Sequence, residues 1–231
     1  MTETQEKTAH PKGLWVLFGT EMWERFNFYG MRAILTLFMV NALMLGESNA
    51  SIIYGGFLAL CYLTPLLGGF IADKYLGNRS CIMLGGSVMA IGQFLLFYSA
   101  TIYGSNLEFS KAIFWLGLFL IIFGNGFFKP NISSMVGNVY TTPQHNHQKD
   151  EGYNIFYMGI NVGAFICNFF GAVLYNTLGW GYAFAAAGIG MFIGVIAFVI
   201  GTKHYADFDV KKPLQEGDMS MLKITGVILF P

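Results

Sequence analysis

Four charged residues, Glu21, Glu24, Arg25 and Arg32, lie in the middle of an apolar segment that spans about residues 14–43. A helix needs about 20 residues to cross a bilayer, so this segment is long enough. Each charge at mid-membrane costs roughly 2.5–3.5 kcal/mol on translocon-based scales. We therefore expect these side chains to pair with one another or to face a water-filled cavity.

The spacing of these residues predicts that they share one face of a helix. At about 100° per residue, six side chains fall within a stripe of about 140°: Glu24, Phe28, Glu21, Arg32, Arg25 and Tyr29. A stripe with both signs of charge suits a structural ion-pair network that only holds helices together. It also suits a pathway for a solute or proton, which we favour because ionisable residues inside membranes most often mark such pathways.

The composition is that of a polytopic membrane protein. Of the 231 residues, 55% are hydrophobic and 11% are charged, whereas soluble domains carry about 25% charged residues. The formal net charge is zero, which excludes the basic footprint of a nucleic-acid-binding protein. The cysteines lie in apolar segments without zinc-ligand spacing, so we expect buried thiols and no metal site: Cys61, Cys81 and Cys167.

Six apolar segments predict an all-α membrane fold with six transmembrane helices. They cover about residues 14–43, 50–73, 80–102, 111–138, 151–176 and 182–202. We expect a tail over residues 1–12, a bundle over 13–203, and a linker with the start of a truncated helix over 204–231. Basic residues in the loops collect on one side, which predicts a cytoplasmic N-terminus in a cell membrane, as in a bacterial inner membrane.

Three further segments carry polar residues at membrane depth. Lys129 lies far from either end of the fourth segment and needs a partner, for which Glu21 and Glu24 are the available acids. Tyr157 and Asn161 share a polar face of the fifth segment, and Tyr62 lies in the second. The structural alternatives are an ion pair for the lysine, an interhelical hydrogen bond for the asparagine and a core position for Tyr62.

The end of the second segment is glycine-rich and leads into a short charged loop that contains Asp73 and Arg79. This pattern resembles the signature loop between helices two and three of the major facilitator superfamily. The resemblance implies a conformational latch at these two residues. Ordinary topology-determining charge is the alternative.

The first segment contains Glu-x-x-Glu-Arg-Phe-x-Phe-Tyr-Gly from residue 21 to 30. This stretch is similar to the ExxERFxYYG signature of the proton-dependent oligopeptide transporter (POT) family, within the major facilitator superfamily. The stretches at 127–131 and 156–163 look like two other signatures of that family. The resemblance covers essentially the whole chain, but only the N-terminal half of such a transporter.

The resemblance implies proton-coupled symport of di- and tripeptides, with no enzymatic activity and no cofactor other than the coupling proton. Membrane lipid and a C-terminal half are the implied partners. It assigns proton coupling to Glu21, Glu24, Arg25 and Lys129, and substrate binding to Arg25, Tyr29, Arg32, Tyr62, Lys129, Tyr157 and Asn161. One departure is Phe28, where the signature usually has tyrosine.

Alternatives in other classes remain open at this point. A transporter of nitrate or another small anion on the same fold would use the same cationic residues. A membrane scaffold without transport activity would tolerate neutral substitutions in the stripe. An intramembrane enzyme is disfavoured because the sequence has neither HExxH nor GxSxG and shows no nucleophile–base pair.

Overall fold

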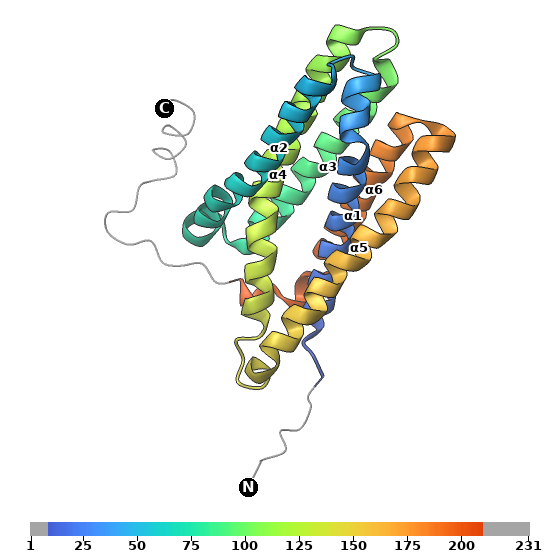
Figure 1. The fold of residues 1–231 in the computed structure, drawn as a ribbon. Coiled ribbons are helices and arrows are strands. Elements are labelled where there is room, and N and C mark those ends of the chain that lie inside the picture. Colours follow the sequence, from blue (N-terminus) through green and yellow to red (C-terminus); the bar gives the residue numbers. More distant parts are fainter. Residues whose placement is uncertain (1–8, 210–231) are drawn as a thin grey trace.

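The computed structural model describes residues 9–209, with the side chain of Ala172 left out. Over this range the chain forms six long helices joined by short connections (Figure 1). They are α1 (Lys12–Asn41), α2 (Glu47–Ile71), α3 (Asn78–Ile102), α4 (Leu107–Val139), α5 (Lys149–Leu178) and α6 (Trp180–Ile200). The predicted all-α fold with six long helices is confirmed, and each helix lies within a few residues of its predicted segment.

The helices α2 to α6 are long and apolar enough to cross a membrane. The exception is α1, which carries the four charged side chains in its middle. The predicted start of a linker helix falls in residues 210–231, which lie outside the described range, as do residues 1–8. The division into tail, bundle and linker stays a prediction.

Tight connections reverse the chain between helices. Gly46, before α2, has φ 75°, and Gly179, between α5 and α6, has φ 91°. Side-chain-bearing residues rarely adopt these conformations, so glycine is the residue that allows such turns. A π-helical turn (Ala72–Leu76) extends α2, and two 3₁₀ turns (Gly201–His204 and Ala206–Phe208) follow α6.

The bundle is organised by a few extensive helix–helix contacts. α3 packs along α4 and α6, α1 packs along α5 and α6, and α2 packs along α4 (Figure 1). By contrast, α1 approaches α2 and α4 at only a few positions. Side chains that bridge α1 to α2 or α4 therefore carry much of the connection between these helices.

Glycines set the closest helix–helix approaches. A Cβ atom on Gly159 would lie 3.0 Å from the ring of Phe18, and one on Gly163 would collide with the backbone of Met22. These two glycines therefore let α5 lie close against α1. Gly190 of α6 has a similar role, because a Cβ atom there would lie 2.6 Å from the ring of Phe26 on α1.

Two aromatic-rich clusters fill the bundle interior. One surrounds Phe38, whose ring centroid lies 5.2 Å from that of Phe184 and 6.0 Å from that of Phe114. The other contains Phe128, Phe156 and Phe198. The three cysteines are buried thiols, as predicted: Cys61, Cys81 and Cys167.

Candidate functional site

Arg25 forms ion pairs with two carboxylates inside the bundle. Its Nε lies 3.1 Å from Oε1 of Glu21 and also pairs with Oε2 of Glu24. The exposed fractions of Glu21, Glu24 and Arg25 are 3%, 0% and 4%. We call these three residues the buried charge cluster. With both acids ionised, the cluster holds one positive and two negative charges.

The buried charge cluster has spare hydrogen-bonding capacity. Oε2 of Glu21, Oε1 of Glu24 and one terminal nitrogen of Arg25 are buried and have no hydrogen-bond partner among the described residues. A buried polar atom without a partner costs free energy, and the cost is larger for charged groups. The two carboxylate oxygens can therefore accept a proton or a hydrogen bond from water or a ligand, and the guanidinium nitrogen can donate a hydrogen bond to one.

Lys129 lies near the cluster but outside ion-pair distance. Its ammonium is 4.7 Å from the ring centroid of Tyr62, which is a cation–π geometry between α4 and α2. Within residues 9–209 no ion pair joins Lys129 to Glu21 or Glu24, although its charge attracts both carboxylates at longer range. The direct partner of both acids is Arg25, which corrects the expected pairing with Lys129.

Arg32 lies about two helical turns after Arg25 on α1 and contacts two tyrosines. Its Nε donates a hydrogen bond to the hydroxyl of Tyr54 on α2, at 2.5 Å. The guanidinium carbon is 5.8 Å from the ring centroids of both Tyr29 and Tyr54. Tyr54 is not among the residues predicted from the sequence. Tyr54 lies eight residues before Tyr62, about 80° away around the helix, so a second tyrosine near the same stripe of α2 was the available signal.

Phe28 has a packing role on this side of α1. Its ring stacks on Phe57 of α2, with centroids 6.1 Å apart and an interplanar angle of 23°. The guanidinium carbon of Arg25 lies 5.4 Å from the centroid of Phe28. The apolar member of the predicted stripe therefore forms an aromatic contact between Arg25 and α2.

The predicted residues of α5 are not brought into contact with the buried charge cluster. Tyr157 is 53% exposed, and Asn161 is also exposed. The amide of Asn161 donates to the backbone carbonyl of Tyr157 in its own helix, at 3.3 Å. Tyr62 is 68% exposed and meets Lys129 only through its ring face. The roles assigned to these residues stay predictions.

Asp73 and Arg79 lie at the turn between α2 and α3. Asp73 is in the π-helical turn, and Arg79 is in the first turn of α3, with Gly77 between them at φ 80°. The backbone N–H of Arg79 donates to Oδ1 of Asp209, at 3.2 Å. The latch role of Asp73 and Arg79 stays a prediction.

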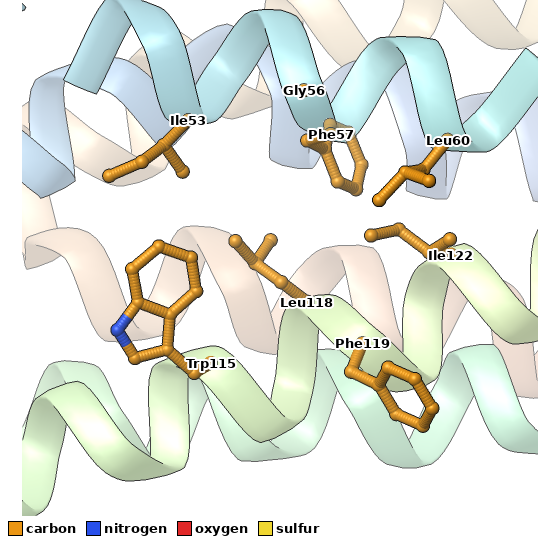
Figure 2. A pocket seen from close by; sticks show the side chains of 8 residues that line it. All are labelled: Ile53, Gly56, Phe57, Leu60, Trp115, Leu118, Phe119 and Ile122. Atoms are coloured by element: carbon orange, nitrogen blue, oxygen red, sulfur yellow. The ribbon is translucent and has the colours of Figure 1, made fainter. Parts of the chain in front are cut away.

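An apolar pocket of about 330 Å³ lies between α2 and α4. Figure 2 shows that its walls are aliphatic and aromatic side chains, including Phe57, Trp115 and Phe119. No charged residue lines it, so it does not offer the chemistry of the buried charge cluster. Phe57 connects the pocket to that region, because its ring also stacks on Phe28.

Further buried polar side chains, not predicted from the sequence, form hydrogen bonds between helices. Asn27 donates to the carbonyl of Ala187 on α6, at 2.9 Å, and accepts a hydrogen bond from Gln93 on α3, at 3.4 Å. Asn125 on α4 donates to the carbonyl of Cys61 on α2, at 2.8 Å. Single polar residues in apolar segments were the available signal, since such residues pair across helices in membranes.

Comparison with known proteins identifies relatives of the chain. A family model described as "PTR2: POT family" matches residues 79–226. The chain is 39% identical to the peptide transporter YePEPT of Yersinia enterocolitica over 195 residues, covering 82% of this chain and 36% of that protein. It is 38% identical to a di-/tripeptide transporter of Lactococcus lactis over 212 residues, covering 87% and 40%. It is 34% identical to the uncharacterized transporter YclF of Bacillus subtilis, covering 90% and 42%.

Solved structures give the same result for the fold. The crystal structure of a POT family transporter in complex with 5-aminolevulinic acid matches with a TM-score of 0.85 and 32% identity, over 97% of this chain and 46% of that one. The crystal structure of the peptide transporter POT in complex with sulfate matches with a TM-score of 0.83 and 34% identity, over 95% and 44%. The chain spans less than half the length of these relatives.

The chain therefore belongs to the POT family, and its six helices correspond to the N-terminal bundle of these major facilitator transporters.

Proposed function

We propose that this chain is the N-terminal half of a symporter that moves di- and tripeptides together with protons across the cell membrane. The buried charge cluster is the observation that carries this proposal. Its three charges lie inside a helix of membrane-spanning length, and three of its polar atoms lack a partner among the described residues. A purely structural ion-pair network would be stable only if its hydrogen bonds were completed.

The cationic residues suit the anionic end of a short peptide. A peptide presents a carboxylate, an ammonium and amides, and arginine matches a carboxylate with its planar fork. Arg32 and Lys129 are partly exposed, and each lies against a tyrosine ring. In the proposal these two residues and Arg25 receive the carboxylate. The amides meet the hydroxyl and amide groups of Tyr29, Tyr62, Tyr157 and Asn161.

Proton coupling can arise because Glu21 and Glu24 share the guanidinium of Arg25. Glu21 and Glu24 both form ion pairs with Arg25. Protonation of either carboxylate therefore removes half of the negative charge that faces the guanidinium. Arg25 can then turn toward a peptide carboxylate, and the attraction on Lys129 also weakens. Proton and peptide thereby bias the same conformational equilibrium, which is the thermodynamic requirement for coupling.

Alternating access would come from the rest of the transporter. Facilitator-type transporters rock two six-helix halves around a site near the membrane midplane. In the proposal this chain supplies one half with its N-terminus in the cytoplasm, and the turn at Asp73 and Arg79 acts as a latch. Two of the relatives above are named for peptides, which supports peptides over nitrate as the substrate class.

Uptake by the full-length transporter in liposomes tests this proposal. With an inward proton gradient, labelled dialanine should accumulate, and unlabelled di- and tripeptides should compete while nitrate should not. Glu21→Gln and Lys129→Ala should each abolish accumulation. Uphill uptake at the native level by Glu21→Gln would remove that carboxylate from the mechanism, and native uptake by Lys129→Ala would remove the lysine.

The chain offers matched controls for both substitutions. Glu108 and Lys111 form an ion pair at 2.9 Å in the first turns of α4, where the Glu108 side chain is 83% exposed. Such exposed pairs contribute about 0–1 kcal/mol. Glu108→Gln and Lys111→Ala should therefore leave uptake unchanged.

A further inference from the structure

Two aromatic contacts connect α1 to α2 where the helices otherwise touch little. Phe28 stacks on Phe57, and four residues farther along α1 Arg32 donates to the hydroxyl of Tyr54. The helices run in opposite directions, so Tyr54 comes three residues before Phe57. The first contact is apolar and needs only packing. The second fixes the position of a cation inside the membrane.

The hydrogen bond to Tyr54 uses only the Nε–H donor of the Arg32 guanidinium. Arginine carries five N–H donors, one on Nε and four on the two terminal nitrogens. Tyr54 accepts from Nε, at 2.5 Å. No ion pair within residues 9–209 occupies the terminal nitrogens of Arg32, and the residue is partly exposed. Its two terminal nitrogens therefore remain available as a fork that matches a carboxylate.

The ring contacts limit the orientation of this fork. The guanidinium carbon lies 5.8 Å from the centroids of Tyr29, one turn back on α1, and of Tyr54 on α2. A guanidinium held by a hydrogen bond and flanked by two rings loses less rotamer freedom when a ligand binds. Preorganisation of this kind raises affinity by lowering the cost of ordering the side chain.

We propose that Tyr54 is a positioning residue for Arg32, which it holds with its two terminal nitrogens ready for the carboxylate of a peptide. The inference rests on the proposed function and deepens it by naming the residue that sets recognition of the carboxylate. The Tyr54 hydroxyl acts through Arg32 and does not itself contact the peptide.

The experiment compares dialanine with its C-terminal amide, which lacks the carboxylate charge, on the full-length transporter. Tyr54→Phe removes only the hydroxyl. It should raise the KM for dialanine by about tenfold, equivalent to about 1.4 kcal/mol, while kcat changes less than about twofold. Binding of the amide should hardly change, so the preference for dialanine should shrink by about tenfold.

A double-mutant cycle distinguishes positioning of Arg32 by Tyr54 from a general stabilisation of the contact between α1 and α2. Arg32→Gln should remove most of the preference for dialanine, and adding Tyr54→Phe to it should change binding no further. Tyr98→Phe is the control, because this α3 tyrosine is 46% exposed and its ring contacts Phe109. The inference is overturned if Tyr54→Phe weakens the binding of dialanine and of its amide equally. It is also overturned if Tyr54→Phe weakens dialanine binding by the same factor in the native protein and in the Arg32→Gln variant.

The same measurements distinguish this inference from the proposed function. Native protein that binds dialanine without proton-driven accumulation would contradict the coupling and leave the role of Tyr54 standing. Native protein that binds dialanine and its amide equally would overturn the role of Tyr54 and leave the coupling standing.

Discussion

Removal of Arg25 should destabilise the bundle strongly, because it leaves two carboxylates buried without their shared cation. Arg25 lies 3.1 Å from Oε1 of Glu21 and pairs with Glu24 as well, and all three residues are at most 4% exposed. At an effective dielectric constant of about 20, one such pair has a gross attraction of about 5 kcal/mol. Desolvation and the repulsion between the two acids offset much of this attraction.

The expected net cost of Arg25→Gln is about 3–5 kcal/mol, the range measured when one partner of a buried ion pair is removed. For a cooperative unit of 150–250 residues, each kcal/mol lowers the unfolding midpoint by about 2–4 °C. The midpoint in detergent micelles at neutral pH should therefore fall by roughly 6–20 °C. Lys111→Gln, which breaks only the partly exposed pair with Glu108, should leave the midpoint nearly unchanged.

A triple variant tests whether charge is the cause. Replacement of Glu21 and Glu24 by Gln and of Arg25 by Met removes all three charges, and well-packed neutral replacements of buried ion pairs are often as stable as the original. This variant should reverse at least half of the decrease in unfolding midpoint that Arg25→Gln causes. The reasoning is refuted if Arg25→Gln unfolds within about 1 °C of the native protein, or if the triple variant is as unstable as the single one.

Three further predictions concern packing, interhelical hydrogen bonds and alkaline stability. Gly68→Ala should cost about 1–3 kcal/mol in thermal unfolding, since its Cβ would lie 2.6 Å from the carbonyl carbon of Gly126; Gly69→Ala is the control, because its nearest neighbour, Pro130, is 3.6 Å away. Asn27→Leu should cost about 1–2 kcal/mol in the same assay, because it leaves the Ala187 carbonyl and the Gln93 amide without their partner; an unchanged midpoint would contradict this. Burial, with a smaller contribution from Glu151, raises the pKa of Tyr140 to about 12, so its contribution to stability is full below the unfolded-chain pKa of about 10 and is lost as the pH rises toward about 12. Tyr140→Phe should flatten the fall of the unfolding midpoint between about pH 10 and 12, and a fall as steep as in the native protein would refute the assignment.

The sequence predicted the features that depend on local periodicity. Six helices followed from the lengths of the apolar segments, and the placement of Glu21, Glu24 and Arg25 on one face followed from a repeat of about 3.6 residues. Both properties are determined within one helix.

The sequence did not predict which side chains meet across helices. Periodicity gives the face of a residue but not the neighbouring helix or the rotamer, so Lys129 was expected to pair with an acid and instead lies against Tyr62. For the same reason Tyr54 was missed, although it is the hydrogen-bond partner of Arg32. The stacking of Phe28 on Phe57 likewise depends on how α1 and α2 are placed in the bundle.

The central claim is that the acids of the buried charge cluster couple proton movement to peptide movement. The most direct test compares proton-driven accumulation of dialanine with dialanine–dialanine counterflow, an exchange that needs no net proton movement, in liposomes with the full-length transporter. Glu21→Gln should retain counterflow and lose accumulation, while the control Glu108→Gln retains both. Retention of proton-driven accumulation by Glu21→Gln and by Glu24→Gln alike would contradict the claim.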